Sequence, residues 1–293
     1  MALFYVYEST EEPSVKKMLF KKSEEALLKA LKLERNNTAV TYALFVVTLA
    51  AEKEGNKLRL VPKREAEEYA LRLKKESQYM GYIAWAEVNL SREKKREFGI
   101  RILKDVSEEY KERPHAYLRL WRIYWEEKDY SRSLEQVEKL FLYMGSIGSA
   151  EIRTITALLY SKSLFAMEEY LRSFNLLQHE FSLNTEYSIF LYQFGKQAVR
   201  SKLTNFFGSA IGSLEECLRS CVEQRHSKVF YYIGLAYYNL GRPLTAFDWF
   251  FKCRKTLKSR GEAMKHRRLL KYLEEYMSYI NIAQYVKKLI SSG

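Results

Sequence analysis

The stretch Lys228–Lys258 reads KVFYYIGLAYYNLGRPLTAFDWFFKCRKTLK. Its apolar residues recur at three- and four-residue spacings, as they do along one face of an amphipathic helix. Gly241, Arg242 and Pro243 interrupt this pattern, and it resumes after them. Glycine and proline are the residues that most often end a helix and begin the next one. The stretch therefore predicts two helices joined by a tight turn.

The order of large and small residues in this stretch resembles a tetratricopeptide (TPR) repeat. The residues that carry the resemblance are Phe230, Ile233, Gly234, Tyr237, Ala246, Phe250 and Cys253. The family implies a helix–turn–helix unit of about 34 residues that buries its apolar face only by stacking on its neighbours. The resemblance thus implies an all-α fold, a right-handed α-solenoid of stacked antiparallel helix pairs. A chain of this length would hold about 12–14 helices.

Two small residues mark the place where the paired helices should approach each other. Helix axes about 8–10 Å apart leave room only for small side chains at the closest point, so we expect Gly234 and Ala246 there. Phe230, Tyr237 and Phe250 would fill the flanking space. Because burial of a phenylalanine contributes strongly to stability, the substitution Phe250→Ala is expected to destabilise the C-terminal half of the chain.

The same order of large and small side chains recurs elsewhere in the chain. We expect repeat units to begin at Met80, Pro114, Leu191 and Ser227, which are 34 residues (80 to 114) and 36 residues (191 to 227) apart. The segment Gly148–Leu183 matches the pattern poorly and is expected to be a further helix pair.

The whole chain is interpreted as one repeat domain. Glycine (12) and proline (4) are scarce in 293 residues, which favours long helices over strands and turns. We expect a single TPR-like domain over 1–293, with divergent N-terminal helices in 1–79, repeats in 80–260 and capping helices in 261–293. Caps are needed because a repeat array leaves an apolar face at its end.

One segment also resembles a second repeat type. Pro114–Leu140 is similar to half-a-TPR (HAT) repeats through Trp121, Tyr124 and Glu126. HAT arrays occur in RNA-processing complexes, so this resemblance adds nucleic-acid-associated assemblies to the functions to be considered.

Basic charge is concentrated near the C-terminal end. The formal net charge is +13, and the segment Lys252–Lys271 holds nine basic residues against Glu262 alone. These residues are Lys252, Arg254, Lys255, Lys258, Arg260, Lys265, Arg267, Arg268 and Lys271. Such a cluster suits a polyanion, either nucleic acid or an acidic peptide. The alternative is a solvated helix end, where cations are favoured without any ligand.

The resemblance also implies a partner-binding groove, because the first helix of each TPR pair lines the concave face. Aromatic residues and arginine are the usual anchors of such interfaces. The candidate groove residues are Trp85, His115, Arg119, Arg122, Trp125, Tyr192, Lys196, Lys202, Lys228, Tyr231, Tyr238 and Asn239. One TPR subfamily binds chaperone C-termini through a clamp of lysine, asparagine and arginine. Tyr231 and Leu235 stand at clamp positions here, so we do not expect that ligand.

Neither a metal site nor a catalytic site is expected. Cys217 and Cys221 are one helical turn apart and His226 is near, but no four-ligand set with zinc spacing is present. Cys217 and Cys253 fall at the same late small-residue position of their repeat units, so we interpret the cysteines as small structural residues. The histidines at 115, 179, 226 and 266 show no catalytic spacing, and phosphate-loop and nucleophile-elbow motifs are absent. We therefore expect no enzyme, no cofactor and no small-molecule substrate.

The cysteine content and the apolar stretches of the chain indicate the cellular compartment. Three cysteines do not form a disulfide framework, which favours a reducing compartment, the cytoplasm or the nucleus. The longest apolar stretch, Ala39–Ala51, is too short to span a bilayer, so membrane insertion is not expected. The sequence predicts a non-enzymatic scaffold subunit that binds a protein partner in a larger complex. The alternative is a nucleic-acid-associated repeat protein that uses its basic C-terminal cluster.

Overall fold

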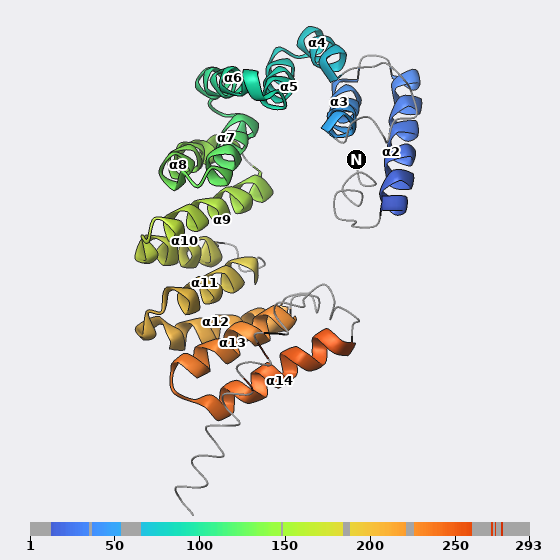
Figure 1. The fold of residues 1–293 in the computed structure, drawn as a ribbon. Coiled ribbons are helices and arrows are strands. Elements are labelled where there is room, and N and C mark those ends of the chain that lie inside the picture. The colour runs from blue at the N-terminus through green and yellow to red at the C-terminus, as the bar shows by residue number, and fades with distance from the viewer. Residues whose placement is uncertain are drawn as a thin grey trace, which may run out of the picture. The chain divides into compact units, whose positions relative to one another are not determined.

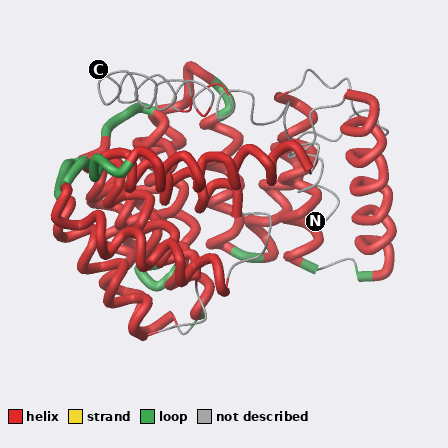
Figure 2. Tube along the Cα trace, turned by 90° about the horizontal axis from the view of Figure 1, so that it is seen from below, coloured by secondary structure: helices red, strands yellow, loops and turns green. Residues whose placement is uncertain are grey.

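The computed structural model describes residues 13–34, 37–53, 66–147, 149–183, 188–220 and 226–259, and the single positions 271, 273 and 277. These residues form 13 α-helices and two short 3₁₀ helices (Figure 1). None of the described residues is in a strand (Figure 2). The predicted all-α class is therefore confirmed. The chain divides into two compact units, Met1–Gly148 and Ser149–Gly293.

Each unit is built from consecutive helices that contact their neighbours in sequence. The helices of the first unit are α2 (Pro13–Leu33), α3 (Thr38–Lys53), α4 (Ala66–Glu76), α5 (Gln78–Leu90), α6 (Arg96–Glu109), α7 (Pro114–Glu126) and α8 (Tyr130–Ile147). Those of the second unit are α9 (Ala150–Ala166), α10 (Tyr170–Leu183), α11 (Ser188–Ser201), α12 (Phe207–Ser220), α13 (His226–Asn239) and α14 (Pro243–Ser259). The 3₁₀ helices η1 (Glu93–Lys95) and η2 (Thr204–Phe206) precede α6 and α12.

From α5 onward the helices form pairs, with α5, α7, α9, α11 and α13 as the first helices and α6, α8, α10, α12 and α14 as the second ones. The first helices begin at residues 78, 114, 150, 188 and 226, which gives spacings of 36, 36, 38 and 38 residues. The expected period of 34 residues between Met80 and Pro114 was wrong, because α5 begins at Gln78 after an N-cap hydroxyl from Ser77. The helix expected to begin at Leu191 begins at Ser188, and the one expected at Ser227 begins at His226. The pair α9 and α10 occupies the segment expected to hold a further pair.

The turns inside three pairs share one backbone geometry. Lys128, Glu168 and Gly241 each follow a first helix and have positive φ angles of 62°, 63° and 71°. In each turn the next residue donates its N–H to the carbonyl five residues earlier, at 2.9 Å, as Asp129 does to Tyr124. This pattern is the Schellman motif, which satisfies carbonyls at the end of a helix. The sequence showed it only at Gly241, because lysine and glutamate occupy the left-handed position in the other two turns.

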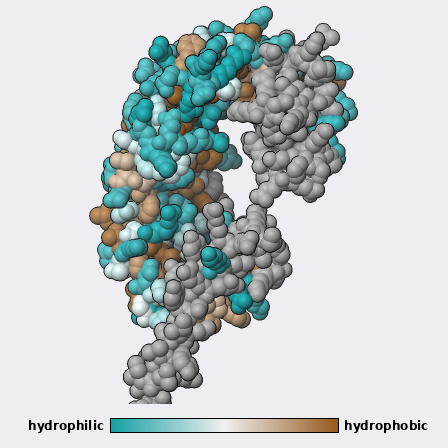
Figure 3. All heavy atoms as spheres, viewed as in Figure 1, coloured by the Kyte–Doolittle hydropathy of each residue, from teal (hydrophilic) through white to brown (hydrophobic). Residues whose placement is uncertain are grey.

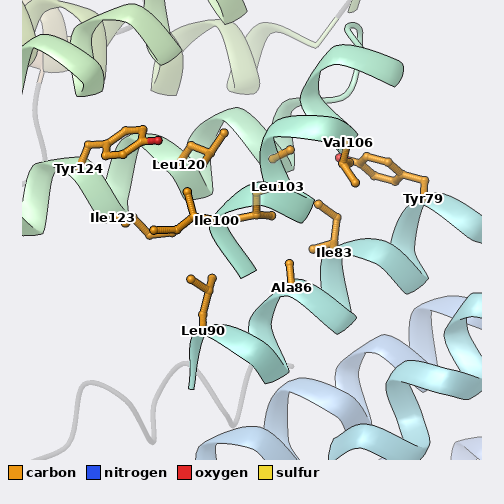
Figure 4. Close-up of a cluster of buried hydrophobic side chains, with 11 residues drawn as sticks. Tyr79, Ile83, Ala86, Leu90, Ile100, Leu103, Val106, Leu120, Ile123 and Tyr124 are labelled. Carbon is orange, nitrogen blue, oxygen red and sulfur yellow. The ribbon is translucent and has the colours of Figure 1, made fainter. Parts of the chain in front are cut away.

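Apolar side chains fill the space within and between neighbouring pairs. In the first unit Ile83, Ala86 and Leu90 of α5 pack with Ile100 and other side chains of α6 and with Leu120 of α7 (Figure 4). Burying apolar surface in this way is the main favourable term in folding. The α5–α6 pair therefore depends on α7 of the next pair for part of its core, as in other repeat proteins.

The close approach predicted in the second unit is confirmed. A Cβ atom added to Gly234 of α13 would lie 2.6 Å from two ring atoms of Phe250 and 3.3 Å from the carbonyl oxygen of Ala246, both on α14. Ala246 and Phe250 are fully buried, and Phe230 and Tyr237 pack against the same cluster. Gly195 of α11 has the same role against Leu214 of α12, where an added Cβ would lie 2.4 Å from Cγ.

Part of the expected domain organisation falls outside the residues that the structure describes. The expected capping helices in 261–293 lie outside them, apart from Lys271, Leu273 and Met277. Leu273 and Met277 are buried and join the cluster around Phe250. The prediction of a single domain over 1–293 stays a prediction. In the described part of the chain, no helix combines the length and apolar character needed to cross a lipid bilayer.

Candidate functional site

The first helices of the second unit lie next to one another. Helix α11 contacts α9 on one side and α13 on the other (Figure 1). Among the predicted groove residues, Tyr192 and Lys196 of α11 and Lys228 of α13 share this surface. The Tyr192 ring lies 6.1 Å from the ring of Tyr232 on α13, edge to face. The Lys196 ammonium lies 6.0 Å from the centre of the Tyr192 ring. Aromatic and basic side chains from adjacent first helices thus meet on one surface.

Three further residues extend this surface and were missed from the sequence. They are Lys162 and Phe165 of α9 and Arg200 of α11, whose guanidinium carbon lies 5.9 Å from the centre of the Phe165 ring. Burial lowers the pKa of Lys196, and the charges of Arg200, Lys162 and Lys228 lower it further. Two of the missed residues, Lys162 and Arg200, occupy equivalent repeat positions. Each lies twelve residues after the first residue of its helix, 150 for α9 and 188 for α11, and this equivalence was a signal in the sequence. The weak repeat pattern in 148–183 concealed it.

The remaining predicted groove residues of the second unit have other surroundings. Tyr231 and Tyr238 pack against the cluster that contains Ala246 and Phe250, so much of their surface belongs to the core. Asn239 is exposed at the last position of α13. Lys202 is exposed and follows the end of α11 with a positive φ of 60°, so it lies in the turn and not on the helix.

In the first unit, charged groove residues are largely paired within the protein. Arg119 of α7 forms a two-pronged ion pair with Glu87 of α5, in which its Nη2 lies 3.0 Å from Oε2. The Nε of Arg122 lies 2.9 Å from Oε1 of Glu126, one turn along the same helix. Glu87 and Glu126 therefore offset much of the positive charge that this pair of arginines would offer to a partner.

The aromatic groove residues of the first unit contribute to packing. Trp125 stacks on the buried Trp121 with ring centres 5.3 Å apart. His115 lies beside Tyr79, whose hydroxyl is 3.1 Å from Nδ1. Burial lowers the pKa of His115, and the charge of Arg113 lowers it further. Trp85 lines a cavity of about 330 Å³ together with side chains of α4 and α6.

Comparisons with known proteins agree with this architecture. The C-terminal part of a TPR repeat-containing protein from Cytophaga hutchinsonii superposes with a TM-score of 0.55 at 9% identity, covering 90% of this chain and 97% of that one. MamA from Desulfovibrio magneticus RS-1 gives 0.51 at 15% identity, covering 62% and 97%. The fold is that of a TPR-like helical repeat.

A chain in the crystal structure of a larger assembly is also similar in fold. The crystal structure of the APC/C hetero-tetramer of Cut9 and Hcn1 gives a TM-score of 0.50 at 15% identity, covering 96% of this chain and 54% of that one. No family model matches the sequence. The search of curated proteins finds no match either. Structural likeness at such low identity shows the fold alone.

The predicted polyanion cluster lies partly outside the described residues. Lys252 and Lys255 are exposed on α14, and the Lys252 ammonium lies 4.1 Å from the centre of the Trp249 ring. Arg254 is half-buried, and Lys271 is exposed. The side chain of Lys258 lies outside the described residues, as do Arg260, Lys265, Arg267 and Arg268. The cluster as a whole stays a prediction.

The cysteines of the TPR-like pairs occupy core positions. Cys217 and Cys253 form no disulfide and have fully buried side chains, and the thiol of Cys253 donates to the carbonyl of Ser227 at 3.0 Å. Burial raises the pKa of Cys253 to about 12. Cys221 lies outside the described residues. Within the part of the chain that is described, no three His, Cys, Asp or Glu side chains gather as metal ligands would.

Proposed function

We propose that this chain is a non-enzymatic scaffold subunit of a multiprotein complex and that it binds a segment of a partner protein on its first helices. The observation that carries the proposal is the surface shared by α9, α11 and α13, where Tyr192, Tyr232 and Lys196 lie together. Aromatic side chains with nearby cations are typical anchors of protein interfaces.

Two further observations support a scaffold. The side chains between paired helices are committed to packing, as Gly234 against Phe250 illustrates, which leaves the first-helix surface as the variable part of each repeat. The likeness to Cut9 supports a place in a complex, since that protein is a component of a hetero-tetramer with Hcn1. Cys217 and Cys253 form no disulfide, which supports a reducing compartment, either cytoplasm or nucleus.

The proposal can be tested with peptides selected from a random library on the full-length protein. We expect selected peptides to lose at least about tenfold in affinity when Tyr192 and Tyr232 are both replaced by alanine, because interface aromatics contribute about 2 kcal/mol or more each. The matched control is Leu244→Ala with Phe251→Ala, two exposed apolar residues of the second helix α14. Circular dichroism would establish that both variants remain folded.

Two outcomes would overturn the proposal. A library that yields no binding peptide would remove the case for a segment-binding surface. Equal affinity for the native protein and the folded Tyr192/Tyr232 variant, with loss in the α14 control, would place binding on the second helices. Hydrophobic and hydrophilic side chains are interspersed on the face drawn in Figure 3, so exposed apolar residues on second helices provide a real alternative.

A nucleic-acid-associated function is the second candidate. The net charge of +13 and the exposed Lys252 and Lys255 favour it. Phosphate contacts release counterions, so such binding would weaken steeply with rising salt, whereas an aromatic protein contact would change little. Salt titration of a bound single-stranded RNA, with Lys252 and Lys255 replaced by glutamine, tests this candidate separately.

A further inference from the structure

Four cations from three consecutive first helices gather on the second unit, and we call them the cationic face. They are Lys162 of α9, Lys196 and Arg200 of α11, and Lys228 of α13. Lys196 is central, since the charges of the other three all act on it. Like charges on neighbouring positions disfavour one another. The arrangement therefore stores an unfavourable interaction that a bound anion would relieve.

Carboxylates of the described residues do not neutralise three of these four cations. Within the described residues, no ion pair joins Lys196, Arg200 or Lys228 to a carboxylate. Other cations in the same repeats are paired, as Arg153 of α9 is with the buried carboxylate of Glu180 on α10 at 2.8 Å. The contrast shows that a shortage of carboxylates in these repeats does not explain the cationic face.

Aromatic rings hold two of these cations in place. The ammonium of Lys196 lies over Tyr192, and the guanidinium of Arg200 lies over Phe165. Cation–π contacts of this kind restrict long side chains that would otherwise be mobile. A positioned cation loses less conformational entropy when it binds an anion, which favours affinity.

The same cation–ring contacts indicate which kind of anion the cationic face suits. Proteins that bind single-stranded nucleic acid present open aromatic faces on which bases stack. Here cations of the protein lie over the rings of Tyr192 and Phe165, and the rings of Tyr192 and Tyr232 meet edge to face. The rings therefore serve the cations and are poorly placed for base stacking, which favours carboxylates over nucleotides.

We propose that the cationic face binds an acidic segment of a partner protein, with aspartate or glutamate carboxylates against Lys196, Arg200 and Lys228. The proposal rests on the scaffold function proposed above and names the chemical class of the partner. Charge-assisted hydrogen bonds from ammonium and guanidinium groups to carboxylates are about twice as strong as neutral ones. A segment with acidic residues spaced along it can reach cations on successive repeats.

The test uses three fluorescein-labelled probes and the full-length protein. The probes are a twelve-residue peptide alternating glutamate and serine, the same peptide with lysine in place of glutamate, and a twelve-nucleotide oligouridine. We expect the acidic peptide to bind in a fluorescence anisotropy titration, with affinity that falls as salt rises. The lysine peptide should not bind, and the oligouridine should bind more weakly than the acidic peptide.

A pair of matched variants shows whether the acidic peptide binds at the cationic face. The triple variant Lys196→Gln, Arg200→Gln, Lys228→Gln should weaken the acidic peptide at least about tenfold, since three charge-assisted contacts are lost. The control Lys75→Gln, Lys94→Gln, Lys95→Gln removes the same charge from exposed residues of α4 and η1 and should change affinity less than about twofold. The cationic-face variant should melt at the same or a higher temperature than the native protein, because like charges are removed. If it misfolds, the exposed Lys228→Gln alone serves, with a smaller loss expected.

Three results would overturn the proposal. The first is a native protein that does not bind the acidic peptide, and the second is a cationic-face variant that binds it as tightly as the control does. Tighter binding of oligouridine, abolished by the cationic-face variant, would assign the face to nucleic acid. Library-selected peptides that still require Tyr192 and Tyr232 in any of these cases would leave the scaffold function standing without an acidic partner.

Discussion

Lys128 and Glu168 hold left-handed backbone conformations that glycine adopts without strain. For an L-residue this conformation costs about 1–2 kcal/mol, while glycine loses about 0.5–1 kcal/mol more in chain entropy on folding. The substitutions Lys128→Gly and Glu168→Gly should therefore each stabilise the fold by up to about 1 kcal/mol. Gly241→Ala, at φ 71°, should destabilise it by a similar amount. Thermal melting of the three variants would show this, and a loss of stability in both glycine variants would refute the account of the turns.

A substitution at Gly234 tests the packing between the two helices of a pair. An alanine there would place Cβ 2.6 Å from the buried ring of Phe250, so the helices must separate or the ring must move. We expect Gly234→Ala to cost about 1–3 kcal/mol, as overpacking of a core usually does. The control is Gly212→Ala on α12, where an added Cβ meets no atom within 4 Å. That change should stabilise the helix by about 0.5–1 kcal/mol. Equal melting temperatures for the two variants would contradict the predicted contact.

Cys253 gives a chemical measure of the same core. Because burial raises its pKa to about 12, the reactive thiolate is scarce at every pH below that value. We expect iodoacetamide at pH 8 to alkylate Cys253 at least about a hundredfold more slowly in the native protein than in denaturant. Peptide mapping by mass spectrometry would report this residue separately. Alkylation at equal rates would mean that the α13–α14 core opens readily.

At the scale of the helix, a buried polar network joins α9, α10 and α11. The Ser173 hydroxyl oxygen lies 2.6 Å from Oε1 of Gln197 and 2.9 Å from the carbonyl oxygen of Ser161, and its one proton can be donated to either acceptor. Gln197 donates to the Ser161 hydroxyl at 2.9 Å. All three side chains are buried, so each polar atom needs these partners. The network fixes how these three helices meet.

Removing the amide from this network should destabilise the second unit. Gln197→Leu leaves the hydroxyls of Ser161 and Ser173 with fewer partners in a buried site, at an expected cost of about 1–3 kcal/mol. Gln193→Leu, at a half-buried position on the same helix, should cost less than about 0.5 kcal/mol. Urea denaturation of both variants would compare them. A urea concentration at the unfolding midpoint for Gln197→Leu equal to or above that for Gln193→Leu would show that the network adds nothing to stability.

This network also explains why one helix pair was hard to recognise in the sequence. Ser161 and Ser173 occupy fully buried positions in α9 and α10, where a TPR-like pattern has small apolar residues. A serine in a helix ordinarily indicates an exposed or capping position. Its burial here depends on Gln197 from the next pair, 24 residues beyond Ser173, and no pattern within 148–183 contains that information.

At the scale of the whole chain, the sequence predicted what local patterns determine. Gly234, Ala246 and Phe250 placed one close helix contact correctly, and Gly241 to Pro243 placed its turn. The period was wrong because two or four extra residues per pair extend the connections and helices without disturbing the core. Such additions are tolerated where they lengthen a turn.

The candidate site could be predicted only in part. Tyr192, Lys196 and Lys228 were identified because they lie outside the packed apolar stripe of recognisable first helices. Lys162, Phe165 and Arg200 were missed, since the weak repeat pattern of 148–183 concealed the correspondence between α9 and α11 and their contacts join these two helices. The pairing of Arg119 with Glu87, which offsets the charge of a predicted groove residue, likewise depends on contact between α5 and α7.

Hydrogen–deuterium exchange of the full-length protein, with and without a library-selected peptide, tests most directly whether first helices bind the partner. A ligand seated on them should slow exchange in α9, α11 and α13 while α10, α12 and α14 exchange at unchanged rates. Slowed exchange confined to α10, α12 and α14 would contradict the account.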